Sequence, residues 1–84
     1  MHAIVIVHKP TDRPTAEPEW HGFLEKIGQI KKTFSNAQEI QENIWQISLE
    51  NGLNELVDIL SLSSSLKFSY RVLMLEDEPN WLTS

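Results

Sequence analysis

Near its beginning the chain carries Ala3-Ile4-Val5-Ile6-Val7, a run of five apolar residues in which four are β-branched. Side chains branched at Cβ favour the extended backbone, because a helix restricts their χ1 rotation. The run is continuous rather than alternating, so both faces of the strand are expected to be covered. We therefore predict a central β-strand here and place the other elements around it.

A loop and a strongly amphipathic helix follow this strand. Pro10 and Pro14 end the extended run, and Pro18 suits the first turn of a helix because its φ is already helical. Apolar residues then recur at steps of three and four, which places them on one side of a helix. This stripe, which we expect to face the sheet, consists of Trp20, Phe23, Leu24, Ile27, Ile30 and Phe34.

The second half of the chain contains two short extended segments, a second helix and a last strand. We predict strands over residues 38–41 and 44–49, and a final strand over 67–75 followed by a polar tail, 76–84. Asn51 is a suitable N-cap for the second helix, which we expect to fray in the serines of 61–65. The predicted apolar stripe of that helix is formed by Leu53, Leu56, Val57 and Leu60.

The resulting order is β-α-β-β-α-β in a single domain, residues 1–84. This is the split-βαβ order of ferredoxin-like α+β two-layer sandwiches, in which the first and third strands occupy the middle of the sheet. That placement fits, because these two strands are rich in apolar residues. The order depends on segment 38–41. Without that strand the chain would form β-α-β-α-β, a small open sheet with both helices on one face.

Composition limits the chemistry and the partners of the chain. It has no cysteine, which excludes disulfides, thiolate metal sites and cysteine nucleophiles and favours a reducing compartment. The N-terminus lacks a basic n-region, and no apolar stretch is long enough for a membrane span. The net charge of −5, with most acids after Asn36, opposes binding to phosphate backbones. We expect a cytoplasmic protein with no cofactor that binds neither nucleic acid nor membranes.

Four short strings resemble small bacterial proteins that have a ferredoxin-like domain: Asn43-Ile44-Trp45, Glu50-Asn51-Gly52-Leu53, Tyr70-Arg71-Val72-Leu73 and Glu78-Pro79-Asn80-Trp81. This resemblance spans most of the chain and implies the fold but no activity. This chain lacks the motifs of two ferredoxin-like families of known activity. Acylphosphatases carry an arginine in a Gly-rich loop, whereas residues 9–14 contain no glycine. Cas2-like nucleases place an aspartate at the end of the first strand, where this chain has His8.

The loop after the first strand concentrates the residues that are capable of chemistry. Loops at the carboxyl ends of strands commonly hold ligands in open α/β sheets. His8 and Asp12, with His21 in the following helix, are candidate acid–base groups, and Lys9 and Arg13 are candidate ligands of a small anion. The competing interpretation is an ordinary solvated loop, because aspartate and proline favour turns. The histidine spacing predicts no metal site, since HxH and HxxxH pairs are absent.

Two classes of function follow from these observations. We favour a non-enzymatic protein-interaction module that forms a homodimer. The alternative is an anion-binding protein or enzyme that uses residues 8–13. The dimer hypothesis rests on counting faces, because two helices cover one sheet face while the first and last strands are apolar on both. We expect the dimer to join through the sheet face that the helices leave open. We place Val5, Val7, Leu73 and Trp81 at this interface. In the competing hypothesis Trp81 folds back and closes the open face within one chain.

Overall fold

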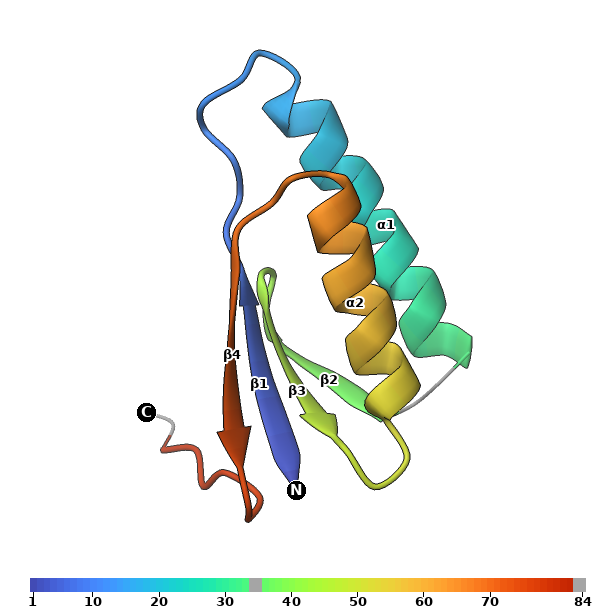
Figure 1. Cartoon of the computed structure of the whole chain (residues 1–84), viewed down its shortest axis with the longest axis vertical. Coiled ribbons are helices and arrows are strands. Elements are labelled where there is room, and N and C mark those ends of the chain that lie inside the picture. Colours follow the sequence, from blue (N-terminus) through green and yellow to red (C-terminus); the bar gives the residue numbers. More distant parts are fainter. Residues whose placement is uncertain (34–35, 83–84) are drawn as a thin grey trace.

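The computed structural model describes residues 1–33 and 36–82, and these form a four-stranded antiparallel sheet with both helices on one side (Figure 1). The elements are β1 (His2–Val7), α1 (Ala16–Thr33), β2 (Ala37–Gln41), β3 (Ile44–Ser48), α2 (Leu53–Ser65) and β4 (Tyr70–Leu75). The strands lie in the order β2-β3-β1-β4, so β1 and β3 are central. The predicted ferredoxin-like order is therefore confirmed, including the short strand β2. None of the helices described is both long and apolar enough to cross a membrane.

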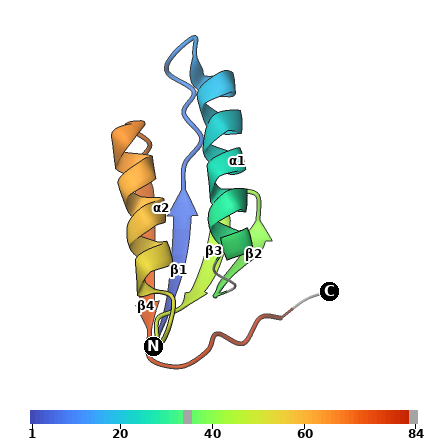
Figure 2. The ribbon, with the colours of Figure 1, turned by 90° about the vertical axis from the view of Figure 1, so that its right-hand side faces the viewer.

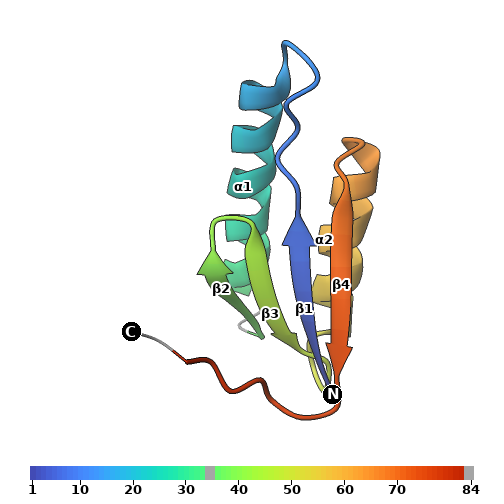
Figure 3. The same cartoon turned by 90° about the vertical axis from the view of Figure 1, so that its left-hand side faces the viewer.

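One sheet face packs against the helices, with α1 over β2 and β3 and α2 over β1 and β4 (Figures 2 and 3). Alternate residues of β1 belong to this face, because successive side chains of a strand point to opposite sides. Val5 lies between Trp45 of β3 and Val72 of β4, and both Val5 and Val7 are completely buried. Their predicted place at an interface is therefore wrong. Their position along β1 turns them toward the helices and into the core.

The inward stripe of α1 agrees with the prediction. Trp20, Phe23 and Ile27 are buried, and Leu24 and Ile30 pack at the edge of the same cluster. Residue Phe34, the last member of the predicted stripe, lies outside the described residues. The spacing of three and four residues thus identified the side of α1 that faces the sheet.

Phe23 is the centre of an aromatic cluster that joins three parts of the chain. Its ring centroid lies 5.3 Å from that of Trp20, 5.3 Å from that of Phe68 and 5.9 Å from that of Trp45. The contacts with Phe68 and Trp45 are edge-to-face, an arrangement that aromatic rings favour electrostatically. Helix α1, strand β3 and the connection from α2 to β4 therefore meet at one buried side chain.

The side that α2 buries differs from the prediction. Leu56 and Ile59 face the core and Leu60 is half-buried, whereas Leu53 and Val57 are 58% and 52% exposed. The predicted stripe is rotated relative to the observed one because a charged residue, Glu55, occupies part of the inward side. Glutamate is rarely buried, so a stripe defined by apolar residues alone places Glu55 on the exposed side of the helix.

Glu55 is completely buried at the beginning of α2. One of its carboxylate oxygens accepts hydrogen bonds from the backbone N–H of Asn36 at 3.3 Å and from its side-chain amide at 2.9 Å. The N-cap of α2 is Gly52 rather than the predicted Asn51. A Cβ on Gly52 would collide with the carbonyl oxygen of Ser48, so this close approach requires glycine.

Helix α2 continues through the serines to Ser65, so the predicted fraying of 61–65 is wrong. Ser63 is completely buried, and its hydroxyl donates a hydrogen bond of 2.8 Å to the carbonyl of Ile59. A serine that bonds to the preceding turn is compatible with a continuous helix. The last strand consequently begins at Tyr70 instead of Lys67.

We expect the substitution Phe23→Ala to lower the free energy of unfolding by about 3–5 kcal/mol, because it removes the centre of the aromatic cluster and leaves a cavity. Urea denaturation measures this change. Leu53→Ala is the matched control, since Leu53 is 58% exposed, and it should change stability by less than about 0.5 kcal/mol. Equal effects of the two substitutions would contradict the assigned core.

Candidate functional site

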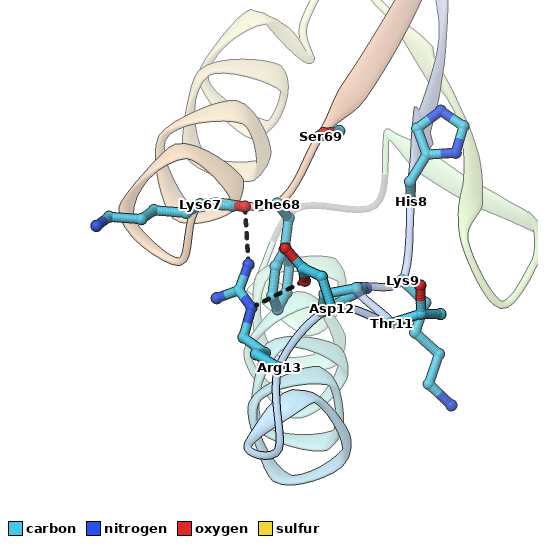
Figure 4. A pocket seen from close by; sticks show the side chains of 9 residues that line it. His8, Lys9, Thr11, Asp12, Arg13, Lys67, Phe68 and Ser69 are labelled. Carbon is cyan, nitrogen blue, oxygen red and sulfur yellow. Dashed lines mark hydrogen bonds and ion pairs between the residues drawn. The ribbon is translucent and has the colours of Figure 1, made fainter.

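The loop between β1 and α1 forms a small pocket with the connection from α2 to β4 (Figure 4). The pocket has a volume of about 210 Å³ and is lined by His8, Lys9, Pro10, Thr11, Asp12, Arg13, Lys67, Phe68 and Ser69. Four of the predicted site residues line it, while His21 does not. The ring of His8 points away from Asp12 and Arg13, so the pocket does not hold the proposed acid–base pair in contact (Figure 4).

Arg13 is held by protein groups on several sides. Its Nη1 donates hydrogen bonds to the carbonyl of Leu66 at 2.9 Å and to Oε1 of Glu19 at 3.1 Å. Its Nη2 donates to the carbonyl of Lys67 at 3.0 Å, and its Nε lies 3.5 Å from a carboxylate oxygen of Asp12. Two carboxylates and two carbonyls therefore occupy the donors with which Arg13 would bind an anion.

The two carbonyls that Arg13 binds belong to the C-terminal end of α2. There the N–H of Phe68 donates to the carbonyl of Ser63 at 2.9 Å and the N–H of Lys67 donates to that of Ser64 at 3.0 Å. This pair of hydrogen bonds is a Schellman motif, whose turning residue adopts a left-handed conformation. Lys67 is that residue, with a φ of 59°. The guanidinium of Arg13 adds a positive charge at the end where the helix dipole is negative.

Lys9 is also paired within the chain. Its Nζ lies 2.6 Å from Oε1 of Glu17, and Nε2 of His21 lies 3.5 Å from the other oxygen of the same carboxylate. The hydrogen bond from Lys9 and the nearby positive charges lower the pKa of Glu17. Both predicted anion ligands, Lys9 and Arg13, thus have a carboxylate partner. Across residues 1–33 and 36–82, His, Asp and Glu side chains form no group of three that could hold a metal ion.

The face of the sheet opposite the helices is partly covered by the tail. Nε1 of Trp81 donates a hydrogen bond of 2.6 Å to Oε1 of Gln46 on β3. The tail leaves β4 on this side of the sheet (Figures 1 and 3). Gln46 and its neighbour across the strands, Ile4, are buried although they face away from the helices. Trp81 therefore contacts its own sheet, while 47% of its surface remains exposed, and its place at an interface stays a prediction.

Three of the exposed large apolar side chains lie on the edge strand β4, and two more, Trp81 and Leu82, lie in the tail. Tyr70, Leu73 and Met74 are 39%, 58% and 49% exposed, and we call these three residues the β4 surface. The sequence pattern places Leu73 at an interface but not Tyr70 or Met74, because it does not show how far α2 extends over β4. The signal in the sequence was the density of apolar residues on both faces of the last strand.

Comparison with known proteins supports the fold. No protein-family model matches the chain, and no curated protein matches its sequence. Among solved structures, the crystal structure of Streptococcus pyogenes Cas2 at pH 6.5 is similar, with a TM-score of 0.55 and 20% sequence identity. The match covers 89% of this chain and 86% of that one. At this identity the similarity shows a shared ferredoxin-like fold and carries no activity with it.

We expect Arg13→Ala to lower the free energy of unfolding by about 1.5–3 kcal/mol, because charged hydrogen bonds to the end of α2 and to Glu19 are lost. Chemical denaturation gives the value. Asp12→Ala is the control, because the Asp12 side chain is 80% exposed and its ion pair should contribute less than about 1 kcal/mol. If Arg13→Ala were as mild as Asp12→Ala, the capping role of Arg13 would be refuted.

We expect Lys67→Gly to stabilise the protein by about 0.5–1 kcal/mol, since glycine adopts the left-handed conformation of Lys67 without the steric cost of a Cβ. The thermal midpoint should rise. Lys67→Ala keeps the Cβ and should leave the midpoint nearly unchanged. A midpoint that rises equally in both variants would show that removal of the lysine side chain, and not backbone relief, is responsible.

Proposed function

We propose that this chain is a non-enzymatic protein-interaction module that forms a homodimer through apolar groups of its sheet. The observation that supports this function best is the β4 surface. Three large apolar side chains are exposed along one short edge strand, with Tyr70 and Met74 on the helix side of the sheet and Leu73 on the opposite side. Apolar groups concentrated in this way mark association surfaces more often than scattered ones do.

The polar pocket supports catalysis less well. A general base and the group that orients it need to lie within hydrogen-bond reach of each other, and His8 points away from Asp12 (Figure 4). The charge of Arg13 serves the end of α2, and that of Lys9 serves Glu17. Lys9 and Arg13, the two candidate anion ligands, are therefore engaged in holding the loop in place.

Light scattering at micromolar concentration tests the dimer. We expect a mass of twice 9.7 kDa for the unmodified chain and a monomer mass for Leu73→Lys, which places a charge on the β4 surface. Leu53→Lys is the matched control, because Leu53 is equally exposed but lies on α2, and it should remain dimeric. A monomer mass for the unmodified chain would refute the proposed function.

A second candidate function, binding of a small anion, is favoured by one observation. The residues around the pocket include His8, Lys9, Arg13 and Lys67 but only one acid, Asp12. If the pocket binds an anion, phosphate or sulfate raises the thermal midpoint, and Arg13→Ala abolishes this dependence on the anion. Unchanged midpoints for the unmodified protein in both salts would eliminate this candidate.

A further inference from the structure

We infer that two copies of this chain pair through their β4 edges in antiparallel orientation, with Val72 of one copy directly opposite Val72 of the other. This inference rests on the proposed function and specifies its interface. The pairing would join two four-stranded sheets into one continuous sheet across a two-fold axis. Backbone hydrogen bonds and the β4 surface would together form the contact.

The two edges of the sheet are protected to different degrees. The edge strand β2 has an irregular register between Glu39 and Gln41, and its exposed side chains are polar. Strand β4 pairs with β1 in a continuous register over all six of its residues and is mostly apolar. Irregularities and polar groups discourage pairing between sheet edges, whereas a regular apolar edge invites it. The edge of β4 is therefore the one suited to another strand.

Nothing in the described part of the chain lies along the outer side of β4. Helix α2 covers one face of the sheet, and the tail turns beneath the opposite face toward β2 (Figures 2 and 3). The hydrogen bond from Trp81 to Gln46 directs the tail to that face. Covering of the sheet face by the tail and pairing at the β4 edge are thus compatible with each other.

The distribution of charge along β4 favours a second copy of this chain as the partner, and it favours an antiparallel orientation of the two strands. Positive charges stand before and near the beginning of the strand, at Lys67 and Arg71, while Glu76, Asp77 and Glu78 follow its end. Antiparallel pairing brings the basic end of each copy beside the acidic end of the other, whereas parallel pairing would bring like charges together. Opposite charges across strands stabilise a pair, and like charges oppose it.

The register follows from which residues share a face. Residues directly opposite in an antiparallel pair point to the same side of the sheet, so the two-fold axis passes through a residue pair. With Val72 at the axis, Tyr70 lies opposite the second copy's Met74, and Arg71 lies opposite its Leu73. This register covers all three residues of the β4 surface. With Leu73 at the axis, Tyr70 would instead face the carboxylate of Glu76.

Single-cysteine variants test this register, because the chain contains no cysteine of its own. Directly opposite residues have Cα atoms about 4.5–5.5 Å apart, within the range that a disulfide spans. We expect Val72→Cys to form a covalent dimer under mild oxidation, and Leu73→Cys to remain uncrosslinked because its two copies would be about 8 Å apart. Val57→Cys on α2 serves as the control for crosslinking by random collision.

A mixture of two exposed variants provides a second measurement that leaves Val72 intact. Tyr70→Cys and Met74→Cys, mixed in equal amounts, should give a crosslinked heterodimer in preference to either homodimer. Crosslinking of Leu73→Cys but not of Val72→Cys would overturn the register. If light scattering shows a dimer and no β4 cysteine crosslinks, the edge pairing is wrong while the proposed function stands. A monomer mass would refute both the edge pairing and the proposed function.

Discussion

Strand β1 lies between β3 and β4 and has both faces covered, and this arrangement constrains the rest of the chain. On one face Val5 and Val7 pack under the helices. On the other, Ile4 is buried beside Gln46, the residue to which the tail is tied through Trp81. Strand β1 also pairs with β3 along one side and with β4 along the other, which leaves β2 and β4 as the edges of the sheet.

The loop that follows β1 contains a charged side chain, Arg13, with a clear structural role. Arg13 reaches from this loop to the carbonyls of Leu66 and Lys67, more than fifty positions away in the chain. It also lies over the ring of Phe68, with its central carbon 5.6 Å from the ring centroid. One charged side chain thus joins the end of β1, the end of α2 and the aromatic cluster. A group held so firmly is poorly suited to releasing its partners for a ligand.

The similarity to Cas2 concerns the fold, and the ferredoxin-like scaffold supports many unrelated functions. What distinguishes this chain is the balance of its surfaces. Lys9 and Arg13 of its candidate polar site are paired with carboxylates within the chain, while three of its exposed apolar groups lie on a regular edge strand. These two features favour association over catalysis for the same physical reason. Groups that have partners within the chain contribute little to new contacts, whereas exposed apolar groups gain from being covered.

The sequence by itself determined the order of the elements, the inward stripe of α1 and the central positions of β1 and β3. These properties depend on local periodicity and on runs of β-branched residues, which act over a few neighbouring positions. Most of the pocket residues could also be predicted from the sequence, since His8, Lys9, Asp12 and Arg13 belong to one loop. The tertiary structure alone decided which face of α2 is buried, because the burial of Glu55 depends on its partner Asn36. It also decided that Val5 faces the core, that Arg13 caps α2 and that Trp81 meets Gln46. These outcomes depend on groups that are distant in the chain, and no local pattern contains the identity of a distant partner.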